Sequence, residues 1–182
     1  STITIFFMES FYKGVQLNCD NSAAATSLLG KILISSKSHI CFAQDIYCTK
    51  IGEVYSPPTF PGFKVFVAAK RSEIPKVALY ISDNIKGTLI SQTSNSHCVL
   101  FKLSSDNSVS NSEYILCSIY SPPSDSTPSL KLQGLFSNLS SNELSNLIMC
   151  GDFNSHSSTW ATLSNTDSKG EELEELFLQN NL

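Results

Sequence analysis

The amino-acid sequence predicts one α/β domain in which two packed, mixed β-sheets are flanked by helices. The 182 residues suffice for one domain with a substantial core. Strand-like runs follow one another without an intervening helix between residues 62 and 120, whereas helical patterns lie nearer the two ends. Such an unbroken series of strands fits two packed sheets covered by helices better than it fits a doubly wound parallel sheet.

The first part of the chain supplies a strand, a helix and a second strand. Residues 14–19 (GVQLNC) read as a strand, and residues 39–43 (HICFA) as a short buried strand. Between them, residues 21–36 place apolar side chains on one face of an amphipathic helix, with Asp20 or Asn21 expected as its N-cap. Residues 1–13 form an N-terminal extension of undefined role, so the predicted domain covers residues 14–182.

The middle of the chain predicts four further strands. β-branched and aromatic residues alternate there with other side chains, as in half-buried strands. A polar stretch, SSDNSVSNS, separates the last two of these strands and predicts a hairpin connection. The predicted strands are residues 62–69, 76–82, 97–103 and 114–120.

The last third predicts helix, strand and helix. A hydroxyl cap at Thr127 followed by Pro128 marks the start of a helix that runs towards Leu139. Residues 146–150 (NLIMC) read as a buried strand. A final helix is expected near Ser168, because Ser168 and Glu171 have the spacing of a capping box.

Composition limits the classes of function. Charged residues make up 15% of the chain, against about 25% in typical domains, and the net charge is −4. A general basic surface for nucleic acid is therefore not expected, although a bound metal ion could supply positive charge locally. No segment has the length and apolarity of a membrane span, so no membrane partner is expected. The six cysteines form no C-x-x-C pair and are predicted to be core residues in a reducing, intracellular compartment.

The sharpest chemical feature is the segment from Gly151 to Asn154 (GDFN), which follows the predicted strand 146–150. Asp152 and Asn154 are two residues apart, so on an extended segment they project to the same side. A carboxylate and an amide placed together could hold a water molecule or a phosphate oxygen. Because Gly, Asp and Asn are also common turn residues, a plain turn is the alternative.

The residues around this segment resemble a known family. GDFNSHSSTW closely resembles the GDFN-A-H-x-x-x-W signature of jockey-like non-LTR retrotransposon endonucleases, which belong to the DNase I-like endonuclease/exonuclease/phosphatase superfamily. Four other segments resemble this family in the same order: QLN with SAAA at residues 16–25, ICFAQDIY at 40–47, ILCSIYSPP at 115–123, and TDSKG with NL at 166–182. The resemblance implies a four-layer sandwich and a DNA-nicking endonuclease domain within a reverse transcriptase polyprotein, acting in the nucleus.

The resemblance also implies roles for individual residues. Asn18 would orient the phosphate or a metal-bound water, and Asp45 would take the place of the metal-binding Glu. Tyr120 would touch the scissile phosphate. Asp152 would orient or activate the attacking water, and Asn154 would help to bind the phosphate. The implied cofactor is Mg²⁺ or Mn²⁺, as one or two ions, and the implied substrate is DNA. His156 and Trp160 match motif positions without an assigned role.

Two departures from the pattern favour other interpretations. Asp45 replaces the family's Glu and is one methylene shorter, so its carboxylate lies about 1.5 Å further back, a displacement that can cost about 10²-fold in rate. The family's Ser-Asp-His segment has no counterpart, so we expect a C-terminally incomplete domain, poorly active alone, with DNA as its substrate once completed.

The alternatives are a non-catalytic retrotransposon relic or another phosphoesterase of the superfamily. In plainer readings, Asn18 only caps the helix, Tyr120 packs in the core, and Asp45 is a surface acid.

Overall fold

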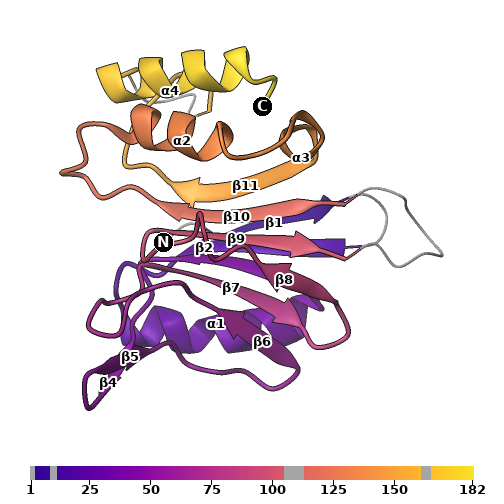
Figure 1. The fold of residues 1–182 in the computed structure, drawn as a ribbon. Coiled ribbons are helices and arrows are strands. Elements are labelled where there is room, and N and C mark those ends of the chain that lie inside the picture. The colour runs from indigo at the N-terminus through magenta and orange to yellow at the C-terminus, as the bar shows by residue number, and fades with distance from the viewer. Residues whose placement is uncertain (1–2, 9–11, 105–112, 161–164) are drawn as a thin grey trace.

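The computed structural model describes residues 3–8, 12–104, 113–160 and 165–182 of the chain. These residues form four layers, in the order helix, sheet, sheet, helices (Figure 1). Two mixed sheets pack face to face, and helices cover the outer face of each. The fold class predicted from the sequence is therefore confirmed.

The first sheet contains five strands in the order β1-β2-β3-β7-β6. Strands β2 and β3 are parallel because helix α1 connects them, and the other neighbours are antiparallel. The elements of this half are β1 (Ile3–Met8), β2 (Tyr12–Asn18), α1 (Ala23–Ser36), β3 (Ile40–Gln44), β6 (Phe63–Phe66) and β7 (Val77–Ser82), with a separate hairpin of β4 (Thr49–Ile51) and β5 (Val54–Ser56).

The second sheet contains four strands in the order β11-β10-β9-β8. Strands β10 and β11 are parallel, since α2 and α3 lie between them in the chain, and the other two pairs are antiparallel. The elements of this half are β8 (Gly87–Leu89), β9 (Cys98–Leu103), β10 (Ile115–Tyr120), α2 (Pro128–Phe136), α3 (Ser141–Ser145), β11 (Leu147–Asp152) and α4 (Ser168–Gln179).

Three apolar clusters fill the spaces between the four layers. Phe42, Leu79 and Phe101 lie in the cluster between the two sheets. A second cluster packs the outer face of the first sheet against α1, and a third packs the second sheet against α2 and α4. Burial of both faces explains why β3 reads as a continuous apolar run, with every residue from Ile40 to Gln44 buried.

The ends of three helices differ from the sequence prediction. Ser22, rather than Asp20 or Asn21, caps α1, because Asp20 and Asn21 take positive φ angles of 51° and 48° in the turn that precedes it. Asp167, rather than Ser168, caps α4 and accepts a hydrogen bond from the Gly170 amide. Helix α2 begins at Pro128 as predicted but ends at Phe136 rather than near residue 139.

Several short elements were not anticipated. Strand β1, within the N-terminal extension, pairs along its length with β2. Strands β4, β5 and β8 and helix α3 are each three to five residues long, too short for a periodic signal. The predicted connection through residues 105–112 lies outside the described residues. Strand β11 extends two residues past the predicted end, to Asp152, which places Asp152 beside Tyr120 in the parallel register.

Candidate active site

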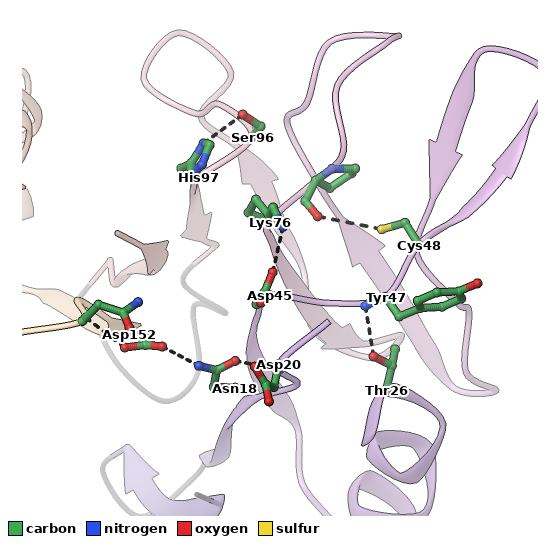
Figure 2. A network of polar contacts seen from close by, with 12 residues as sticks. Asn18, Asp20, Thr26, Asp45, Tyr47, Cys48, Lys76, Ser96, His97 and Asp152 are labelled. Atoms are coloured by element: carbon green, nitrogen blue, oxygen red, sulfur yellow. Dashed lines mark hydrogen bonds and ion pairs between the residues drawn. The ribbon is translucent and has the colours of Figure 1, made fainter. Parts of the chain in front are cut away.

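The candidate site lies where the two parallel strand pairs end. In the first sheet Asn18 is paired with Gln44, the residue just before Asp45. In the second sheet Tyr120 is paired with Asp152. A hydrogen bond between Asn18 and Asp152 joins these two edges, so the carboxyl ends of β2, β3, β10 and β11 meet at one place (Figure 2). Four strands that are distant in sequence thus supply polar side chains to one site.

The Asp152 carboxylate is held through both oxygens. Oδ2 accepts a hydrogen bond from the Asn18 side-chain amide. Oδ1 accepts one from the backbone N–H of Asn154, at 3.0 Å. Asn18 is itself fixed, because its Oδ1 accepts the Asp20 backbone N–H at 2.9 Å. The carboxylate is therefore oriented before any substrate arrives.

Asn154 connects the loop after β11 to the end of β10. Its φ of 47° lies in the left-handed region that Asn tolerates better than most residues. Its side-chain amide donates to the backbone oxygen of Ser121 at 2.9 Å. The Asn154 side chain also opposes the rise in the pKa of the Tyr120 phenol. In this arrangement Asn154 fixes its neighbours as well as facing the site.

Tyr120 lies between the charged groups of the site. Burial raises the pKa of its phenol, and the carboxylates of Asp45 and Asp152 raise that pKa further, while Lys76 opposes them. The phenol therefore keeps its proton at neutral pH and can donate a hydrogen bond to an anionic oxygen.

A buried polar network connects the two sheets next to these groups. Gln44 is fully buried and donates through Nε2 to Ser118 Oγ at 3.1 Å. Its Oε1 accepts a hydrogen bond from Gln16 at 3.1 Å. Gln16 also reaches the backbone oxygen of Gly151 at 3.3 Å. These residues carried no role in the sequence analysis, since nothing local shows that they meet across two sheets.

Asp45 forms an ion pair. Lys76, just before β7, places its ammonium 2.9 Å from Asp45 Oδ1 (Figure 2). The Asp45 side chain is 13% exposed and the Lys76 side chain is 29% exposed, so the pair is largely shielded from water. The plain reading of Asp45 as a surface acid is therefore wrong. No local pattern in the sequence points to Lys76, since its place depends on the register between β3 and β7.

His97 flanks the site from the start of β9. Its ring stacks on that of Tyr120, with centroids 6.3 Å apart and an interplanar angle of 18°. Loss of hydration lowers the pKa of His97, and the ammonium groups of Lys131 and Lys76 lower it further. The ring is therefore neutral at pH 7. This position makes His97 part of the site wall.

A cleft of about 920 Å³ opens on the side of Tyr120 and His97 that faces α2. Lys70 and Lys131 are among its lining residues, whereas Asn18, Asp45 and Asp152 are not. The cleft therefore lies beside the polar cluster rather than over it. Tyr120 belongs to both, because it lines the cleft and is paired with Asp152 in the sheet.

His156 connects the GDFN loop to helix α4. Asp167 Oδ2 accepts the backbone N–H of His156 at 3.0 Å and lies 3.1 Å from its ring Nδ1. A Cβ at Gly170 would lie 1.8 Å from the His156 carbonyl oxygen, so only glycine allows this close approach. The GDFNSH and TDSKG segments are thus one packed unit, in which His156 has a structural role. Trp160 contacts the ring of Phe177 and is 44% exposed.

The residues present do not form a ready metal centre. Across the described ranges, no three His, Cys, Asp or Glu side chains gather closely enough to hold a metal ion. Asp45, to which the resemblance assigns the metal, already has one oxygen bonded to Lys76. A divalent cation at Asp45 would face an adjacent ammonium of the same sign. In this arrangement the donor set does not fit Mg²⁺ or Mn²⁺.

Comparisons with known proteins agree with the fold. Residues 114–182 match the family described as Endonuclease-reverse transcriptase. The structure resembles the endonuclease domain of TRAS1, a telomere-specific non-LTR retrotransposon, with a TM-score of 0.75 and 20% identity, over 93% of this chain and 70% of that one. No curated protein matches the sequence.

Two AP endonucleases share the same architecture at lower similarity. The enzyme of Leishmania major has a TM-score of 0.60 and 11% identity, over 98% of this chain and 72% of that one. That of Archaeoglobus fulgidus has a TM-score of 0.50 and 16% identity, over 93% and 70%. The resemblance to the DNase I-like superfamily is therefore confirmed at the level of the fold.

In the described part of the chain, no helix is long and apolar enough to cross a membrane.

Proposed function

We propose that this chain, which has the DNase I-like fold and matches an endonuclease-reverse transcriptase family over residues 114–182, is the DNA-nicking endonuclease domain of a non-LTR retrotransposon polyprotein. The observation that carries the proposal is the hydrogen bond from Asn18 to Asp152 beside Tyr120. Catalytic carboxylates need a fixed orientation, and here the orienting group comes from the opposite sheet. The fold alone would not specify this function.

The geometry suits hydrolysis of a phosphodiester. Asp152, anchored on both oxygens, can orient a water molecule and accept its proton as the water attacks phosphorus. The phosphorus–O3′ bond breaks, the water oxygen stays on the 5′ phosphate, and the leaving 3′ oxygen takes up a proton from solvent. Tyr120, with its proton retained, donates to a non-bridging oxygen whose negative charge grows in the transition state. The product is a nick with a 3′ hydroxyl, which could prime reverse transcription.

The site also needs positive charge, because Asp45 and Asp152 would repel a phosphodiester. The cofactor proposed from the resemblance is one or two Mg²⁺ or Mn²⁺ ions, with Asp45 as a ligand. That assignment requires Lys76 to leave the Asp45 carboxylate. Asn18 and Asn154 are proposed to help to position the phosphate, Asn18 from β2 and Asn154 from the loop after β11.

Nicking of supercoiled plasmid tests the proposal. Because the domain is expected to be poorly active alone, the 182 residues are assayed in a chain completed by the family's Ser-Asp-His segment. We expect open-circular product in Mg²⁺ or Mn²⁺ and none with a chelator. Asp152→Asn should lower the rate by about 10² to 10⁴-fold, the usual contribution of a general base. Asp83→Asn, at an exposed position after β7, is the matched control and should keep the wild-type rate. A folded wild-type chain that does not nick in either metal would overturn the proposal and favour the non-catalytic alternative. Release of inorganic phosphate from small monoesters, without nicking, would instead favour another phosphoesterase.

A further inference from the structure

The Asp45–Lys76 pair is held in place by the backbone as well as by charge. The Asp45 N–H donates to the Lys76 carbonyl oxygen at 2.6 Å, one residue beyond the last paired residues of β3 and β7. The carbonyl of Asp45 accepts the Asn21 N–H at 2.7 Å, and the Lys76 N–H donates to the Ser96 carbonyl at 2.7 Å. Both main chains are therefore fixed on either side of the ion pair. Ordering the two side chains costs less entropy than it would in a mobile surface pair.

The surroundings strengthen the pair. The side chains are largely shielded from water, and Lys76 Nζ lies 2.9 Å from Asp45 Oδ1, within hydrogen-bond distance. Charge-assisted hydrogen bonds are stronger than neutral ones, and low hydration reduces screening by salt. No other ammonium or guanidinium group in the described residues pairs with Asp45. Lys76 is therefore the counter-ion on which this carboxylate depends.

We infer that Lys76 is an internal cation that competes with divalent metal for the Asp45 carboxylate. This inference deepens the proposed function, since it concerns the charge balance of the same site. A metal ion at Asp45 must displace the ammonium and lose the hydrogen bond that it donates. The free chain therefore binds divalent cations weakly at Asp45, and Lys76 is the residue that sets that affinity. Lys76 is a positioning residue and not a catalytic one.

Calorimetric titration of Mn²⁺ into the chain, without DNA, tests the inference. Lys76→Met removes the charge, and Lys76→Gln removes the charge but keeps an N–H donor for Asp45. Both should bind Mn²⁺ at least about tenfold more tightly than the wild type, which is one decade in the equilibrium constant. Lys76→Arg keeps the charge and should bind as weakly as the wild type. Lys31→Met removes an exposed lysine from α1 and should change nothing.

The double variant Lys76→Met with Asp45→Asn assigns the gain to this carboxylate. In that background the tighter binding should disappear. If Lys76→Met and Lys76→Gln, both shown to be folded by circular dichroism, bind Mn²⁺ no better than the wild type, the inference is wrong. It is also wrong if the gain survives Asp45→Asn, since the ion would then be held elsewhere. Because no DNA is present, these outcomes are independent of whether the chain nicks plasmid.

Discussion

The side-chain amide of Asn18 donates a hydrogen bond to the carboxylate of Asp152, a residue 134 positions later in the chain and in the other sheet. This contact joins the ends of β2 and β11. Asn and Asp at strand ends commonly form turns or cap helices. Here the contact orients Asn18 and Asp152 as a polar pair. The proposed chemistry depends on this orientation, and the orientation depends on how firmly the two sheets are fixed to each other.

The hydrogen bonds of Gln44 are expected to contribute much of the stability with which the two sheets are held together. Gln44→Ala would remove the inter-sheet partner of Ser118 and the same-sheet partner of Gln16, and would create a small cavity. We expect the free energy of unfolding to fall by about 1–3 kcal/mol, the cost of stranded buried polar groups. Urea denaturation measures this loss. Gln133→Ala, exposed on α2, is the control and should change the stability by less than about 0.5 kcal/mol. Equal stability of both variants would show that the network contributes little.

Two of the helical glycines, Gly170 and Gly134, should respond to alanine in opposite directions. A Cβ at Gly170 would collide with the His156 carbonyl, whereas a Cβ at Gly134 would meet nothing within 4 Å. Gly170→Ala should therefore lower the free energy of unfolding by about 1–3 kcal/mol. Gly134→Ala, within α2, should raise it by about 0.5–1 kcal/mol through helix propensity. Thermal unfolding distinguishes the two, and a stabilising Gly170→Ala would contradict the packing of His156 on α4.

The pH dependence of stability should contain a contribution from His97. Loss of hydration, with Lys131 and Lys76 nearby, lowers its pKa in the folded state below the ordinary value, while Asp125 and Glu73 oppose this. The unfolded chain therefore takes up the proton first as pH falls. Neutral His97 makes its full contribution to the free energy of unfolding above about pH 6.5. This contribution is lost as the pH falls towards the lowered pKa of the folded state.

Urea midpoints at about pH 7.5 and about pH 5.5 test this, because they lie on either side of the ordinary histidine pKa. The wild type should lose more stability between these pH values than His97→Asn does. The carboxylates whose pKa is lowered, such as Asp167 beside the Gly170 amide and Glu174 beside Thr159, titrate in a more acidic range. Identical pH profiles for the two proteins would show that His97 is not perturbed.

The sequence predicted those parts of the site that depend on local pattern. The spacing of Asp152 and Asn154 after an apolar run predicted a polar pair at a strand end, and the structure brings both to Tyr120. Helix α1 was recognisable from its apolar face, although its cap was displaced to Ser22 by a turn of positive φ residues. The roles proposed for Asn18, Tyr120, Asp152 and Asn154 remain proposals that the geometry supports.

The rest depends on contacts between distant segments. Lys76 is 31 residues from Asp45, and only the antiparallel register of β3 and β7 makes them neighbours. Gln44 is an unremarkable polar residue in the sequence, yet it is fully buried because partners from β2 and β10 satisfy it. Strand β1 has only β2 as its neighbour, and its first residues are exposed, so it gives no pattern of burial to detect. Such features follow from sheet register, which periodicity alone does not reveal.

The most direct test of the site is a double-mutant cycle on Asn18 and Asp152, measured as single-turnover nicking in Mn²⁺. Asn18→Ala should lower the rate by about 10²-fold through misplacement of the carboxylate, and Asp152→Asn by more. Because Asn18 is proposed to act through Asp152, adding Asn18→Ala to Asp152→Asn should cause little further loss. Losses that multiply would show that Asn18 and Asp152 act independently, which would contradict the proposal that this inter-sheet pair is one catalytic unit.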